Sequence, residues 1–109
     1  MSSDEVFVRH MIDAIDEIQK MLDGMTYKKF VNDHIRMYAS VRLFEVLGEA
    51  ANKLSSDYQK KYQTIPFADI IGMRNKLIHH YFEVDLEILW KVYEDDLREL
   101  KDKLESSLK

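Results

Sequence analysis

Residues 2–22 read SSDEVFVRHMIDAIDEIQKML and indicate the fold class. Ser2, followed three positions later by Glu5, matches a capping box, which marks the start of a helix. Apolar side chains then recur at intervals of three and four until Asp23-Gly24 interrupts the pattern. The whole chain of 109 residues contains one proline and three glycines. The sequence therefore predicts an all-α protein.

The helical periodicity continues along the rest of the chain. A second helix is expected from about residue 26 to residue 54 as one long element, with a short helical turn over residues 58–63 after it. Pro66 suits the first turn of a third helix that covers residues 66–80. A last helix is expected from residue 85 to near the C-terminus. We therefore predict a single domain, residues 1–109, folded as an antiparallel bundle of four to five helices.

Charge and composition limit the function classes. Sixteen Lys and Arg against twenty Asp and Glu give a net charge of −4, which opposes broad adhesion to nucleic acid, so no DNA binding is expected and any RNA contact must be local. The chain has no cysteine, which excludes disulfides and thiolate metal sites. No window approaches the ~20 apolar residues that a membrane span needs, and the first residues carry acids where an export signal needs bases. A cytoplasmic protein without a membrane partner is expected.

The candidate site is the segment RNKLIHHY, residues 74–81. Arg74 offers a permanently charged fork suited to phosphate, His79 can move a proton near neutral pH, and Tyr81 supplies a hydroxyl. Asn75 and His79 are spaced i,i+4 on the expected helix, and one polar arc can hold all four side chains. We expect catalysis on a phosphodiester, with His79 transferring the proton, Arg74 stabilising charge and Asn75 in support.

Two further interpretations of this segment are a metal site and a purely structural role. Adjacent histidines on a helix point ~100° apart and no carboxylate stands at a matching i+4 position, so neither a metal site nor another cofactor is expected at His79 and His80. Arg, Asn and His near a helix C-terminus can also simply neutralise the helix dipole and bond the last carbonyls. The spacing alone leaves this structural role open.

One histidine cannot easily serve as both base and acid on opposite sides of a phosphate. A symmetric homodimer would place two arginines and two histidines in one cleft. We therefore expect the third helix to meet its copy across a twofold axis.

Four stretches of the chain together resemble one known family. Residues 74–82 are similar to the Arg, four residues, His, one residue, Tyr signature of the HepT-like branch of the HEPN superfamily, the toxin of the HepT/MntA toxin–antitoxin pair. Residues 42–50 resemble the Gly-Glu-Ala helix of that family, residues 65–73 its lead-in to Arg-Asn, and residues 84–90 its following helix. The resemblance covers nearly the whole chain in order.

The resemblance implies a dimeric HEPN bundle that cleaves RNA without a metal and is restrained by a nucleotidyltransferase antitoxin of the MntA type. Arg74 and His79 match the catalytic pair of the family, and Tyr81 matches the tyrosine that the antitoxin modifies with AMP. An anionic nucleotide beside Arg74 and His79 would block the substrate phosphate. Two alternatives stay open: a noncatalytic module that binds a nucleotide or a nucleotidyltransferase, and a purely structural dimerisation bundle.

Overall fold

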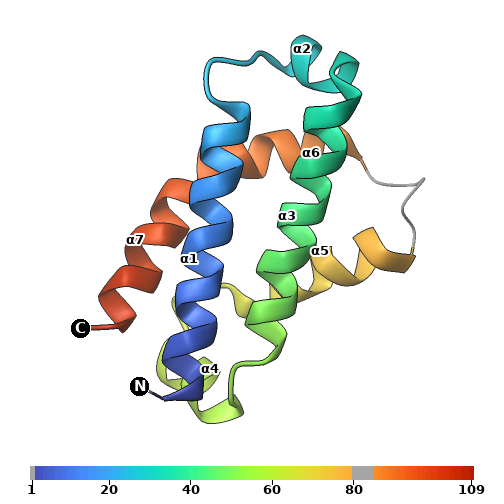
Figure 1. Ribbon diagram of the computed structural model, residues 1–109. Coiled ribbons are helices and arrows are strands. Elements are labelled where there is room, and N and C mark those ends of the chain that lie inside the picture. The colour runs from blue at the N-terminus through green and yellow to red at the C-terminus, as the bar shows by residue number, and fades with distance from the viewer. Residues whose placement is uncertain (1, 80–84) are drawn as a thin grey trace.

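The computed structural model describes residues 2–79 and 85–109, and in these ranges every regular element is a helix (Figure 1). The elements are α1 (Ser3–Leu22), α2 (Tyr27–Asn32), α3 (His34–Asn52), α4 (Ser56–Lys61), α5 (Phe67–His79), α6 (Leu86–Lys91), the π-helical segment η2 (Val92–Asp96) and α7 (Leu97–Ser107). The predicted all-α fold is confirmed. None of these helices is long and apolar enough to cross a membrane.

Helix α1 begins after the predicted cap at Ser2 and ends before the predicted stop at Asp23-Gly24. The Ser2 hydroxyl accepts the backbone N–H of Glu5 at 3.2 Å, which satisfies one of the free donors at the helix start. Gly24 follows the helix with φ of 74°, a left-handed conformation that glycine adopts without steric cost. Local capping and turn chemistry therefore set both ends of α1.

The prediction of one long helix over residues 26–54 is wrong, because the chain divides at Asp33 into α2 and α3. The Asp33 backbone N–H donates to the Lys29 carbonyl and so closes α2. The Asp33 carboxylate accepts the backbone N–H of Arg36 at 3.1 Å and pairs with the Arg36 guanidinium at 3.3 Å, which opens α3. An aspartate side chain can hydrogen-bond to nearby backbone groups and so compete with a continuous helix. At Asp33 these local hydrogen bonds replace the continuous helix.

The last predicted helix is also interrupted. α6 passes through η2 before α7 continues, so the regular α-helical hydrogen bonding changes over residues 92–96. A π turn accommodates an extra residue within a helix. The apolar stripe therefore changes register between α6 and α7.

Helix α3 lies at the centre of the fold and packs against both α1 and α5 (Figure 1). α1 and α3 run antiparallel, α7 packs against α1, and α5 crosses behind α3 at a steep angle. Phe44 of α3 and Leu77 of α5 are buried in a common hydrophobic core. Trp90 of α6 contacts Tyr27 and Phe30, so an aromatic cluster joins α2 to α6. The shared core around Phe44 and Leu77 therefore fixes the C-terminal half of α5 against α3.

Candidate active site

Helix α5 carries three of the expected site residues, and His79 is its last residue. Arg74 is half-buried, whereas Asn75 and His79 are exposed. His80 and Tyr81, the latter expected to be the modified tyrosine, lie outside the described residues. The described part of the site therefore consists of an arginine set into the fold and two polar side chains at the surface.

Arg74 and Asn75 form a direct pair. An Nη1 hydrogen of Arg74 is donated to the Asn75 side-chain carbonyl at 2.9 Å. This bond joins residues that are neighbours in the sequence. A hydrogen bond to one guanidinium nitrogen limits the rotation of the fork, and so Asn75 helps to orient the charge of Arg74.

The other end of the guanidinium is enclosed. Arg74 Nε is buried and has no hydrogen-bond partner among the described residues. The stem of Arg74 lies against α3 beside Gly48. No carboxylate of residues 2–79 or 85–109 forms an ion pair with Arg74. Within these ranges, the charge of Arg74 is not neutralised by a neighbouring acid.

The acids of α3 near Gly48 are occupied by another arginine. Nη1 of Arg42 lies 3.0 Å from Glu45 Oε2 and 3.0 Å from Glu49 Oε1. The hydrogen bonds that Arg42 donates to Glu45 and Glu49, aided by the charge of Glu49, raise the pKa of Arg42 above its already high ordinary value. Arg42 pairs with both glutamates, and its single positive charge offsets one of their two negative charges on the helix that faces Arg74.

The side chains of Arg74 and His79 leave helix α5 in different directions. They are five residues apart, which turns them ~140° from one another around a helix. Arg74 accordingly faces α3, while the His79 imidazole is exposed and has no hydrogen bond to any described residue. Asn75 and His79 are thus on the exposed part of α5, and the stem of Arg74 faces the bundle while its Nη1 reaches Asn75.

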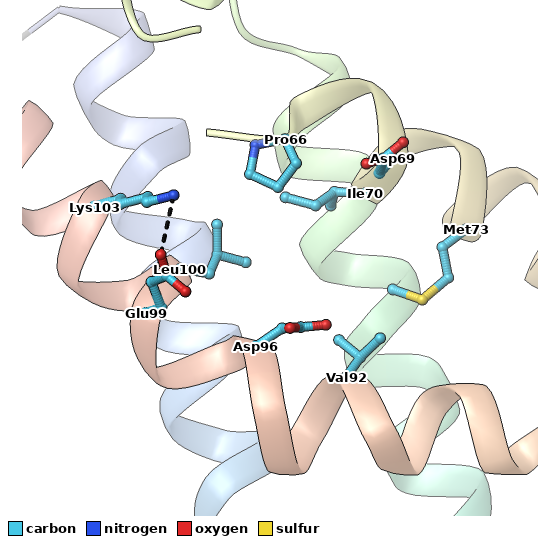
Figure 2. A pocket seen from close by; sticks show the side chains of 9 residues that line it. All are labelled: Pro66, Asp69, Ile70, Met73, Val92, Asp96, Glu99, Leu100 and Lys103. Carbon is cyan, nitrogen blue, oxygen red and sulfur yellow. Dashed lines mark ion pairs between the residues drawn. The ribbon is translucent and has the colours of Figure 1, made fainter. Parts of the chain in front are cut away.

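A hollow of about 330 Å³ lies along another side of α5, between this helix and η2 and α7 (Figure 2). Its floor is apolar, with Ile70, Met73, Val92 and Leu100 around it, and its rim includes the residues Asp69, Asp96, Glu99 and Lys103. Glu99 pairs with Lys103 at 3.3 Å, which leaves Asp69 and Asp96 as negative groups on this side. Carboxylates repel phosphate, and we therefore do not place an RNA backbone here.

Among the described side chains, no three His, Asp or Glu residues gather into a group that could hold a metal ion. Gly48 is the position in this region whose importance sequence reasoning missed. The only signal was its place in the stretch that resembles a family Gly-Glu-Ala helix.

An all-α bundle with an arginine and a histidine on the helix that packs against the central one fits the HEPN class. The chain belongs to the HepT-like ribonucleases: the family model described as "Ribonuclease HepT-like" matches residues 11–107.

Relatives along the whole chain agree with this assignment. A Methanocaldococcus jannaschii protein named "Putative RNase MJ1216" is 37% identical over 105 residues, covering 96% of this chain and 87% of the relative. A Thermococcus cleftensis protein named "Probable ribonuclease HepT" is 32% identical over 99 residues, covering 91% of this chain and 90% of the relative. No solved structure matches the chain.

Proposed function

We propose that the protein is a metal-independent endoribonuclease that acts as the toxin of a HepT/MntA-type toxin–antitoxin pair. The observation that carries the proposal is Arg74, a guanidinium oriented by Asn75 and not neutralised by any described carboxylate, on the helix that ends in an exposed His79. Membership of the HepT-like ribonuclease family supports RNA as the substrate.

The proposed reaction is an in-line transesterification. A histidine takes the proton from a ribose 2′-hydroxyl, and the oxygen attacks the adjacent phosphorus. The bond from phosphorus to the 5′-oxygen breaks, and that oxygen receives a proton from a second histidine. The products are a 2′,3′-cyclic phosphate and a 5′-hydroxyl, while Arg74 stabilises the charge that develops on the phosphoryl oxygens.

We propose that the second histidine comes from a second copy of the chain. The ~140° between Arg74 and His79 on one helix supports this arrangement, because one chain presents the two groups in different directions. Two copies of α5 around a twofold axis would allow each arginine to face a histidine across a shared cleft. Ile78 lies between Arg74 and His79 in the sequence of α5 and is 39% exposed. It is an apolar side chain suited to such a contact.

We further propose that Tyr81 is the site of regulation. Its hydroxyl oxygen would attack the α-phosphate of ATP on a partner nucleotidyltransferase, forming a phosphodiester to AMP and releasing pyrophosphate. The added negative charge, two residues from His79, would repel the substrate phosphate. Intact-mass measurement after coexpression should show the mass of one AMP per chain, and Tyr81→Phe should remove it.

Cleavage of RNA in the presence of EDTA tests the catalytic proposal. We expect products that end in 2′,3′-cyclic phosphate, and we expect His79→Ala to abolish their formation. His10→Ala is the matched control, because His10 is also an exposed helical histidine but lies on α1. Unchanged cleavage by a folded His79→Ala variant would remove the proposal, and RNA binding without scission by the wild type would favour the noncatalytic module.

A further inference from the structure

Gly48 of α3 stands unusually close to the Arg74 side chain. A Cβ atom built at Gly48 would lie 2.1 Å from Arg74 Cβ, 2.8 Å from Arg74 Cγ and 3.1 Å from the Ile70 carbonyl oxygen. Any side chain at this position would therefore overlap the base of Arg74. The absence of a side chain at Gly48 creates the space that the stem of Arg74 occupies.

The overlap could not be relieved by a change of rotamer at Arg74. Its nearest atom is Arg74 Cβ, which is fixed to the backbone and moves only when α5 moves. Glycine within a helix reduces helix stability relative to alanine, so its presence at position 48 is explained by close packing rather than by helix formation. Packed helices respond to an added methyl group by shifting.

The two ends of the Arg74 side chain are thus fixed by different contacts. Gly48 admits the stem, Nε is buried, and Nη1 is bonded to Asn75. The other glycines of the chain do not play this part. A Cβ added at Gly24 or at Gly72 would have no atom within 4 Å.

We propose that Gly48 is a positioning residue, whose missing side chain lets the Arg74 stem pack against α3 and thereby fixes where the guanidinium meets a substrate phosphate. The catalytic consequence rests on the proposed ribonuclease function. The positioning of Arg74 itself does not depend on that function and can be measured without it.

The kinetic test compares Gly48→Ala with Gly72→Ala. Each variant adds one methyl group to a helical glycine, but only the methyl group at position 48 meets Arg74. A displacement of about 1 Å can lower a rate by about 100-fold, so we expect Gly48→Ala to lower kcat on RNA by about 10- to 100-fold. Gly72→Ala should keep the wild-type kcat. A fully folded Gly48→Ala enzyme with the wild-type kcat would overturn the proposal.

A spectroscopic test reads the position of Arg74 directly. The buried Nε–H of Arg74 should give a slowly exchanging side-chain signal in a ¹H–¹⁵N NMR spectrum, assigned by its loss in Arg74→Lys. We expect this signal to shift or to exchange faster in Gly48→Ala and to stay in place in Gly72→Ala. An unchanged signal in folded Gly48→Ala would contradict the proposal. If the wild type cleaves no RNA, the ribonuclease proposal fails while this measurement still decides the role of Gly48.

A third variant covers the case in which Gly48→Ala does not fold. Arg74→Gly removes both side-chain atoms that the new methyl group would meet. The double variant Gly48→Ala/Arg74→Gly should then regain a cooperative thermal unfolding transition. Failure of the double variant to fold, with Arg74→Gly alone folded, would show that the overlap with Arg74 is not the cause and would overturn the proposal.

Discussion

The two sides of α5 differ in how closely they are packed. Toward α3, the helices approach until the stem of Arg74 occupies the space above Gly48. Toward η2 and α7, a hollow lined by Met73 and Val92 separates the elements (Figure 2). The closely packed side holds Arg74, the cation that we assign to the substrate phosphate. The side with the hollow carries the acids Asp69 and Asp96. The precision that catalysis requires is therefore expected from the packing of α3 on α5.

Removing a large side chain from the close side should have the largest effect. Phe44 is fully buried on α3, one helical turn before Gly48. Phe44→Ala should lower the free energy of unfolding by about 3–5 kcal/mol, because it loses buried apolar surface and leaves a cavity. Met73→Ala, which truncates a half-buried residue of the hollow, should cost about 1 kcal/mol. Chemical denaturation of both variants measures the difference, and equal costs would break the comparison.

Replacing Arg74 by lysine should impair function more than folding. Lysine keeps the charge but loses the planar fork and the geometry of the bond to Asn75. We expect kcat/KM on RNA to fall by about 100-fold, comparable with the loss of one oxyanion-stabilising donor. Arg9→Lys, an exposed change on α1, is the control and should leave kcat/KM unaltered. Equal kcat/KM for wild type and Arg74→Lys would mean that only charge matters at this position.

A methyl group at Gly72, which lines a neighbouring hollow between α5 and α6, should be tolerated or favourable. Gly72 lies within α5 and has no atom within 4 Å of an added Cβ. Gly72→Ala should therefore raise the free energy of unfolding by about 0.5–1 kcal/mol through helix propensity alone. Thermal unfolding monitored by circular dichroism measures this gain. A loss of stability would show that α5 is as closely packed on this side as it is against α3.

The smallest effect is expected at the rim of the hollow. Glu99 is exposed and pairs with Lys103 at 3.3 Å, and exposed ion pairs of this kind contribute about 0–1 kcal/mol. Glu99→Gln should consequently leave both the melting temperature and RNA cleavage nearly unchanged. A large drop in cleavage would move the RNA site to this side of α5.

Much of this architecture could be predicted from the sequence, because apolar periodicity and caps are local signals. Ser2 and Glu5 gave the start of α1, and Pro66 gave the start of α5. The break at Asp33 could not be predicted, since its bonds to Lys29 and Arg36 compete closely with a continuous helix. The π turn at residues 92–96 could not be predicted either. An extra residue within a helix leaves the helical composition of the segment unchanged.

The sequence indicated the residues of the candidate site but not the contacts that Arg74 makes. Arg74 and His79 were named from their spacing and from family resemblance, but the contact of Arg74 with Asn75 joins adjacent residues, which do not face each other on a helix surface. Gly48 is 26 positions before Arg74 in the sequence, and only the packing of α3 on α5 reveals their contact. Tertiary contacts of this kind leave no periodic signal.

The most direct test of the central claim, a site shared by two chains, uses mixed dimers. Differently tagged subunits allow isolation of dimers with one intact chain and one His79→Ala chain, alongside a control with one His10→Ala chain. Because loss of a general acid or base typically costs a factor of about 10²–10⁴, the mixed His79→Ala dimer should cleave RNA at less than about a tenth of the wild-type rate. The control should retain the full rate. A mixed His79→Ala dimer with about half the wild-type rate would contradict the shared site.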